Sequence, residues 1–148
     1  MSVAVHVSAE GVRLPIARER VSEIARRVLA AEGVREATLS ITFLGTRAMA
    51  ALNKKHLGQP GATDVISFGF SESGRRGPVI GDIYIAPDVA RANARRYEAG
   101  IREEVARLVV HGVLHVLGYD HDEGERRVTS RMWRRQERLL ALVAEARA

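Results

Sequence analysis

The feature that most restricts the fold of this 148-residue chain is the segment HGVLHVLGYDH, at residues 111–121. On an α-helix, residues four apart lie one turn along and about 40° around the axis, so His111 and His115 project from the same face. Gly118 stands where a helix can end in a left-handed residue, a conformation that glycine adopts without a Cβ penalty. The chain can then turn back and bring His121 toward the same point. The segment therefore predicts a helix that gathers three imidazoles around one metal ion.

The ligand set favours zinc. Three neutral imidazoles without a carboxylate leave one coordination position open, as in a catalytic rather than a structural zinc site. The chain has no cysteine, so thiolate ligands are excluded. We expect one zinc ion per chain, and nickel or iron would also fit such a site. The alternative is a set of unrelated histidines, although burial of an unpaired imidazole on an apolar helix is costly.

The spacing is also that of the H-E-x-x-H-x-x-G-x-x-H motif of metzincin proteases. In this chain Gly112 follows the first histidine, so the glutamate that acts as the general base of those proteases is absent. We therefore expect the metal scaffold without peptide hydrolysis by that mechanism. A zinc protease is the weakest of the candidate functions.

Charge and composition permit an RNA partner without requiring one. The formal net charge is +5 and the sequence pI is about 10.4, so the chain is attracted to phosphate backbones. Only two of the 23 cationic residues, Lys54 and Lys55, are lysines, and an arginine-rich composition explains the same excess. The N-terminus has no secretory pattern, and no apolar run reaches the ~20 residues that cross a bilayer. We expect a soluble, cytoplasmic protein.

Hydrophobic periodicity predicts one mixed domain, with strands first and helices clustered toward the end. Alternating apolar residues predict strands around residues 3–7, 39–43, 64–68 and 81–86. Apolar residues at helical spacing predict helices over 15–31, from a Thr46 cap through 52, and over 87–96, 101–117 and 123–146. Residues 71–78 form a polar loop between two of the strands.

Three segments together resemble a known family. The segment HGVLHVLGYDH closely resembles the signature of the YbeY family, bacterial rRNA maturation factors described as single-strand-specific endoribonucleases. Leu52-Asn53 followed by TDVISF at 63–68 is similar to that family's L-N … T-[DN]-V-L-S-F block. GDIYIAP at 81–87 is similar to its G-D-[IL]-x-I strand. The matches follow the family's order and extend from residue 52 to residue 122.

The resemblance implies a fold, a cofactor, an activity and partners. The fold is α/β (α+β): a single domain over residues 1–148, with a small mixed four-stranded sheet covered by helices and the metal in a cleft. His111, His115 and His121 match the three zinc ligands. The implied activity is zinc-dependent endoribonuclease cleavage in 16S rRNA 3′-end maturation and ribosome quality control. The implied partners are rRNA and the small ribosomal subunit, with ribosomal proteins or assembly GTPases as further candidates.

One position departs from the family pattern. An arginine thought to assist RNA cleavage ends the family's N-x-x-[YFW]-R stretch, but this chain reads NKKHL there and has Leu57 in the arginine position. That catalytic role is not transferred to any residue here. Lys54, Lys55, Arg75 or Arg76 could supply the charge, and each also suits a solvated surface.

Several polar residues are candidates for supporting roles near the metal. Asn53, Ser67 and Asp82 could face the cleft and orient its ligands, although turn and strand-edge roles suit them as well. His56 and His6 are expected to be structural or exposed. Asp120 and Asp122 flank the third histidine, where they could orient it or cap a helix, and capping suits Asp122 better.

Two functions remain open. In the first, the ion lowers the pKa of its water from 15.7 toward about 7, and the hydroxide attacks phosphorus or deprotonates the ribose 2′-OH, with Asp82 or no residue handling protons. In the second, the protein is a non-catalytic, zinc-stabilised ribosome assembly factor whose arginine-rich helix Arg126–Arg138 docks onto rRNA or a ribosomal protein. An enzyme needs an exchangeable water, whereas an assembly factor tolerates a site closed by a fourth ligand.

Overall fold

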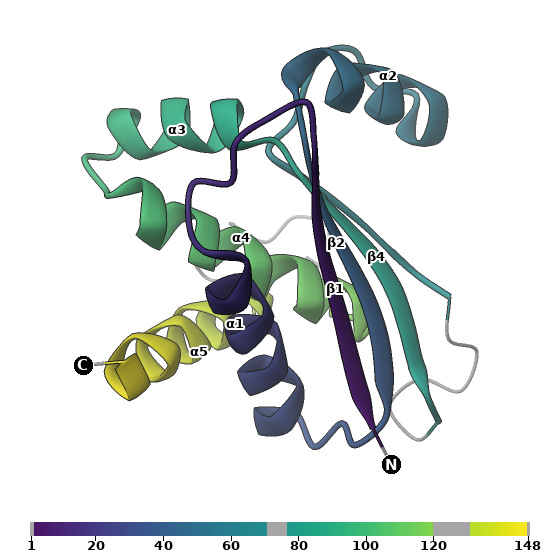
Figure 1. The fold of residues 1–148 in the computed structure, drawn as a ribbon, viewed down its shortest axis with the longest axis vertical. Coiled ribbons are helices and arrows are strands. Elements are labelled where there is room, and N and C mark those ends of the chain that lie inside the picture. The colour runs from purple at the N-terminus through teal and green to yellow at the C-terminus, as the bar shows by residue number, and fades with distance from the viewer. Residues whose placement is uncertain (1, 71–76, 120–130, 148) are drawn as a thin grey trace.

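The computed structural model describes residues 2–70, 77–119 and 131–147 (Figure 1). In chain order its elements are β1 (Val3–Glu10), α1 (Arg18–Ala31), β2 (Ala37–Leu44), α2 (Thr46–Leu57), β3 (Val65–Gly69), β4 (Val79–Ile85), α3 (Pro87–Arg96), α4 (Ile101–Val116) and α5 (Arg131–Arg147). No helix in these three ranges is long and apolar enough to cross a membrane.

The strands form one mixed sheet in the order β1-β2-β4-β3. Strands β1, β2 and β4 are parallel, and β3 runs antiparallel to β4 at the edge of the sheet. This topology confirms the predicted α/β fold with a small mixed four-stranded sheet. Because β3 is the edge strand, the end of α2 and helix α4 both reach it and line one cleft with it.

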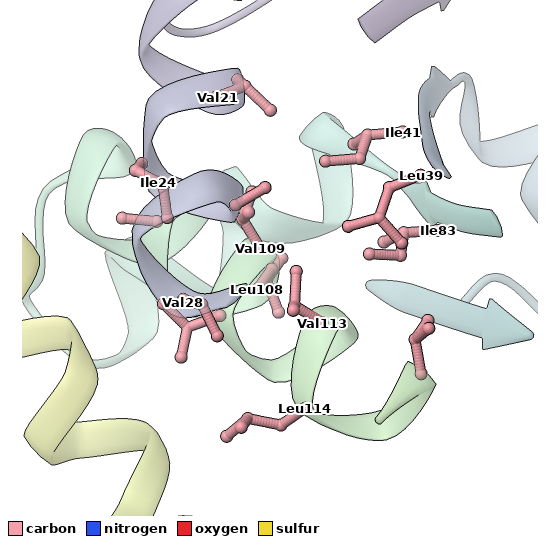
Figure 2. Packing of buried hydrophobic residues seen from close by; sticks show 14 of the residues in the cluster. Val21, Ile24, Val28, Leu39, Ile41, Ile83, Leu108, Val109, Val113 and Leu114 are labelled. Atoms are coloured by element: carbon pink, nitrogen blue, oxygen red, sulfur yellow. The ribbon is translucent and has the colours of Figure 1, made fainter. Parts of the chain in front are cut away.

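The main core lies between one face of the sheet and helices α1 and α4, with α5 packed behind them (Figure 1). Alternate residues of the strands point toward the helices, as the period of two predicts. Figure 2 shows Leu39, Ile41 and Ile83 from the sheet meeting side chains of α1 and α4. The helices contribute mainly Val21, Ile24, Val28, Leu108, Val109, Val113 and Leu114. Full burial of an aliphatic side chain of this size stabilises the fold by about 1.5–3 kcal/mol.

A smaller apolar cluster lies on the opposite face of the sheet, under α2. Met49 of α2 packs with Ile66 of β3 and Ala86, and Phe68 and Tyr84 border the cluster. This packing fixes α2 across the end of the sheet and brings its last residue, Leu57, to the β3 edge. The sheet thus has α4 on one side of β3 and the end of α2 on the other.

The helix starts differ from the sequence predictions. Helix α1 begins at Arg18 and not in the first turn after Pro15, because Ala17 has an extended backbone (ψ 141°) and Ile16 turns into the core. Thr46 is the first residue of α2 and not its cap. Gly45 takes the cap position with an extended backbone, and its carbonyl accepts the Met49 N–H at 3.0 Å.

Two elements are longer than predicted: α2 continues five residues beyond the predicted end at 52, to Leu57, and β1 continues to Glu10. Apart from the start of α1, the other described boundaries agree with the predictions to within two residues. Strand β3 is shifted by one residue from the predicted 64–68, and α3 and α4 end within one residue of their predicted ends. The last helix is described from Arg131 onward. Residues 123–130 of its predicted span, and residues 71–76 of the predicted polar loop, lie outside the described residues.

Candidate metal centre

Helix α4 places two imidazoles side by side at the β3 edge of the sheet. The ring centroids of His111 and His115 are 4.5 Å apart, with an interplanar angle of 68°. Both rings line a cleft of about 190 Å³. The other residues lining it come from the end of α2 and from β3: Leu57, Val65, Ile66 and Ser67. The predicted pair at helical spacing therefore shares one cleft, as a metal site requires.

Helix α4 ends in the left-handed turn that the sequence predicts. Gly118 has φ +101°, and its N–H donates to the His115 carbonyl at 3.0 Å. The Tyr119 N–H donates to the Leu114 carbonyl, also at 3.0 Å, which completes a Schellman motif. The chain thus reverses directly after the second histidine.

The third predicted ligand, His121, lies outside the described residues. Asp120 and Asp122, its predicted neighbours in orienting or capping roles, lie outside them as well. Within residues 2–70, 77–119 and 131–147, no group of three His, Asp or Glu side chains could hold a metal ion. The three-histidine set therefore stays a prediction, supported by the described pair.

A buried glutamine on α5 fixes the orientation of the first imidazole. The Nδ1 of His111 lies 2.7 Å from Oε1 of Gln136, a residue that is only 1% exposed. The Gln136 amide nitrogen donates to Oε2 of Glu137 at 3.1 Å, so its oxygen is the atom that faces the ring. The imidazole must then donate from Nδ1, which leaves the Nε2 lone pair available to a metal.

Charged hydrogen bonds extend this support to the start of α4. The Arg107 guanidinium binds both carboxylate oxygens of Glu137, at 3.0 and 3.2 Å, and donates to Glu104 at 3.1 Å. The hydrogen bonds to Glu137 raise the pKa of Arg107 against the opposing effect of its burial. Helix α5 is thereby fastened to α4 one turn before the first histidine.

Gln136 was not predicted as a site residue, although it is a polar residue on the buried face of an amphipathic helix. On α5 the buried positions are Met132, Leu139, Leu140 and Val143, and a polar residue falls within the same series. A buried amide needs hydrogen-bond partners. A polar residue on the apolar stripe of a helix is therefore a candidate for orienting a ligand.

The position next to the first histidine has no room for a side chain. A Cβ atom at Gly112 would lie 2.7 Å from Cγ2 of Ile83, and two more atoms of that side chain lie within 3.3 Å. Helix α4 thus approaches β4 so closely that the glutamate of the protease motif has no place here. The structure supports the exclusion of peptide hydrolysis by that mechanism.

The position of the family arginine does lie at the cleft. Leu57 is 52% exposed and lines the cleft together with both histidines. Lys54 and Lys55 are exposed in the last turns of α2 and are absent from its lining. Arg75 and Arg76 lie outside the described residues.

Only one of the three predicted supporting residues, Ser67, lines the cleft. The prediction for Asp82 was wrong. It lies between Gly81 and Ile83, which face α4, so strand alternation turns its side chain to the opposite face of the sheet. Asn53 is buried and donates from Nδ2 to the Gly61 carbonyl at 2.9 Å, which gives it a role in the turn after α2.

The remaining histidines are placed as predicted. His56 is exposed, and its ring packs edge-on against Phe68 with centroids 5.3 Å apart. His6 is exposed on β1, at the far edge of the sheet. Neither lines the cleft.

Comparison with known proteins gives one consistent family. The family described as Endoribonuclease YbeY matches residues 6–144. The chain is 40% identical over 139 residues to an endoribonuclease YbeY of Anaeromyxobacter sp. (strain Fw109-5), covering 94% of this chain and 71% of the relative. It is 35% identical to that of Chlorobium phaeobacteroides (strain BS1), covering 85% and 88%. A Thermotoga maritima protein solved in solution has the same fold, with a TM-score of 0.64, 22% identity, and coverage of 97% and 91%.

Proposed function

The chain belongs to the endoribonuclease YbeY family, and from this premise we propose that it is a zinc-dependent enzyme that cuts single-stranded RNA. The family consists of endoribonucleases, hydrolases that act on RNA, and its membership implies rRNA processing. We further assign the cleavage to 3′-end maturation of small-subunit 16S rRNA and to ribosome quality control. Residues 1–148 would then act as one metal-dependent domain on the small ribosomal subunit.

The observation that supports this proposal most directly is the pair of imidazoles in one cleft. His111 and His115 lie within ring contact, and the Gln136 hydrogen bond leaves Nε2 of the first ring available. We assign His121 as the third ligand, because the chain reverses at Gly118 directly before it. When bound, zinc supplies Lewis-acid chemistry to a phosphodiester.

The protein's own groups bind and orient the substrate. The Ser67 hydroxyl can donate to a phosphate oxygen in the cleft, whereas Leu57, Val65 and Ile66 offer apolar walls to a ribose or a base. Gln136 keeps the His111 proton on Nδ1. Asp82 takes no part in proton transfer, because it lies on the other face of the sheet.

The alternative function is a zinc-stabilised assembly factor without catalysis. Leu57 favours it, since an apolar side chain stands at the cleft in place of the arginine that assists cleavage in the family pattern. In that case the ion would only fasten α4, and RNA processing would belong to another protein.

Cleavage by purified protein of known zinc content distinguishes the two functions. Wild type, His115→Ala and Leu57→Arg are incubated with single-stranded RNA and with immature small ribosomal subunits. We expect cleavage that follows zinc content, falls at least about 100-fold in His115→Ala, and rises in Leu57→Arg. His6→Ala is the matched control, because it removes an exposed histidine far from the cleft.

Two results contradict the enzyme. Full cleavage by His115→Ala would show that the histidine cleft is not the active site. Stoichiometric zinc and tight binding to the small subunit, without cleavage by wild type or by Leu57→Arg, would identify the assembly factor.

A further inference from the structure

Helix α5 carries an arginine-rich surface that the proposed reaction does not use. Arg131, Arg134 and Arg138 follow one another at spacings of three and four residues, which places them along one face of the helix, and all three are exposed. They border a pocket of about 420 Å³. We call this the arginine pocket, and its lining residues are Glu32, Tyr119, Arg131, Arg134, Arg135 and Arg138.

The floor of the arginine pocket is fixed by a buried carboxylate. The Glu32 side chain is 3% exposed, and its Oε1 accepts the Tyr119 hydroxyl at 2.6 Å. Its Oε2 accepts from Nε and Nη2 of Arg135, at 2.8 and 2.6 Å. Glu32 therefore holds the Arg135 guanidinium in place and offsets its charge.

The other three arginines of the pocket, Arg131, Arg134 and Arg138, have no acidic partner among the described residues. Glu137, on the same helix, is bound by Arg107 instead. The described residues of the arginine pocket thus include four guanidinium groups and one carboxylate, a net charge of +3.

This charge pattern suits a chain of phosphates. Guanidinium groups bind phosphate oxygens in bidentate fashion, because their planar, weakly hydrated fork of N–H donors matches the phosphate geometry. From Arg131 to Arg138 the helix rises about 10 Å, a length over which one nucleic acid strand presents about three phosphates. A polymer of phosphates matches the three charges better than a single anion.

We propose that the arginine pocket is a second RNA-binding site, which binds the backbone of a single strand away from the histidine cleft. The inference rests on the proposed function, which supplies RNA as the substrate. Gln136, which contacts His111, lies about 140–200° around α5 from the three arginines. The two sites are therefore on opposite sides of one helix, and only a strand long enough to pass around it reaches both.

Salt-dependent binding tests this site separately from cleavage. The probes are 5′-fluorescein oligouridylates of 20 and 5 nucleotides, titrated by anisotropy from 50 to 300 mM KCl in a His115→Ala background that prevents cleavage. For the 20-mer, the triple variant R131Q/R134Q/R138Q should flatten the slope of log K against log [salt] by about 2, or 0.7 for each lost phosphate contact. Its affinity should fall at least about tenfold at 50 mM salt. The 5-mer is long enough to fill the arginine pocket but not to reach the histidine cleft as well, so its slope should flatten by a similar amount while its affinity stays below that of the 20-mer.

The matched control removes the same charge from another helix. R91Q/R95Q/R96Q takes three exposed arginines from α3 and should leave the slope unchanged. Equal slopes for wild type and R131Q/R134Q/R138Q would overturn the inference. It would also be overturned if a 20-residue polyglutamate, or inorganic phosphate at equal phosphate concentration, bound as tightly as the 20-mer and lost as much in the triple variant.

The cleavage assay keeps the two proposals apart. A flattened slope together with no cleavage by wild type would support the arginine pocket and contradict the enzyme. Zinc-dependent cleavage together with an unchanged slope would support the enzyme and contradict the arginine pocket.

Discussion

The substitution Gly112→Ala tests how closely α4 must approach the sheet to hold its histidines. The new Cβ would lie 2.7 Å from Cγ2 of Ile83 and 3.2 and 3.3 Å from its Cδ1 and Cγ1. Ile83 cannot easily withdraw, because it is fully buried in the main core and its β-branched side chain is stiff at χ1. Either α4 moves away from β4 or the core repacks.

Two effects of opposite sign set the size of the change. Alanine is a better helix former than glycine by about 0.8–1.0 kcal/mol in a helix interior. Insertion of a methyl group into a well-packed core costs about 1–3 kcal/mol, and three close contacts place this site at the upper end. We therefore expect a net loss of about 2 kcal/mol in the free energy of unfolding, or roughly 4–8 °C in Tm for a domain of this size.

Urea unfolding of a double-mutant cycle measures this overlap directly. Ile83→Ala removes the three atoms nearest to the new Cβ, so in that background Gly112→Ala should stabilise by up to about 1 kcal/mol, the helix-propensity gain alone. The coupling energy between the two sites should then be about 3 kcal/mol. If Gly112→Ala alone were as stable as wild type, or the coupling were near zero, the inferred close approach would be wrong.

Two further substitutions test the contact between Gln136 and His111 and the environment of Tyr84, on the face of the sheet that α2 partly covers. Gln136→Leu roughly preserves the side-chain volume but removes the acceptor of the His111 proton, so the affinity for zinc should fall about 10–100-fold. Competition with a chromophoric chelator measures that affinity, and an unchanged value would refute the orienting role of Gln136. Burial raises the pKa of Tyr84 above the ordinary value of 10.0, and the charges of Asp82 and Glu10 add to this. The contribution of the Tyr84 hydroxyl to the free energy of unfolding is therefore complete below pH 10 and is lost as pH rises through the raised pKa. Urea unfolding from pH 8 to 11 should show a smaller loss in Tyr84→Phe than in wild type, whereas Tyr97→Phe, which removes an exposed phenol, should behave as wild type.

The fold was largely predictable because its elements have strong, separate periodicities. In strand β2 the alternating apolar residues Leu39, Ile41 and Phe43 can be named from the sequence, and all three are fully buried. Thr42 and Leu44 are buried too, which alternation alone does not predict. Helix starts were predicted less well, since Pro15 and Thr46 are both compatible with a first turn. The choice of Arg18 for α1 depends on Ile16 turning into the core, which is a tertiary effect that a local pattern does not contain.

The candidate site was predictable only where its geometry is local. The spacing of His111 and His115 and the turn at Gly118 follow from helix geometry alone. The role of Gln136 depends on how α5 docks against α4, 25 residues along the chain. The misplacement of Asp82 has a similar origin, because strand register decides which face a residue occupies, and a shift of one residue reverses it.

The described lining of the histidine cleft is uncharged, so the arginine pocket is a candidate source of attraction for RNA phosphates. The described residues around His111 and His115 are Leu57, Val65, Ile66 and Ser67, none of which carries a charge. Among the described residues, electrostatic attraction of a phosphate backbone then comes from cations outside the cleft, and α5 holds three that no described carboxylate neutralises. If both proposals hold, the cleft orients the reacting phosphodiester, and the three arginines supply electrostatic attraction from the opposite side of α5. Loss of the three arginines should accordingly raise KM for long RNA, whereas loss of His115 should lower kcat.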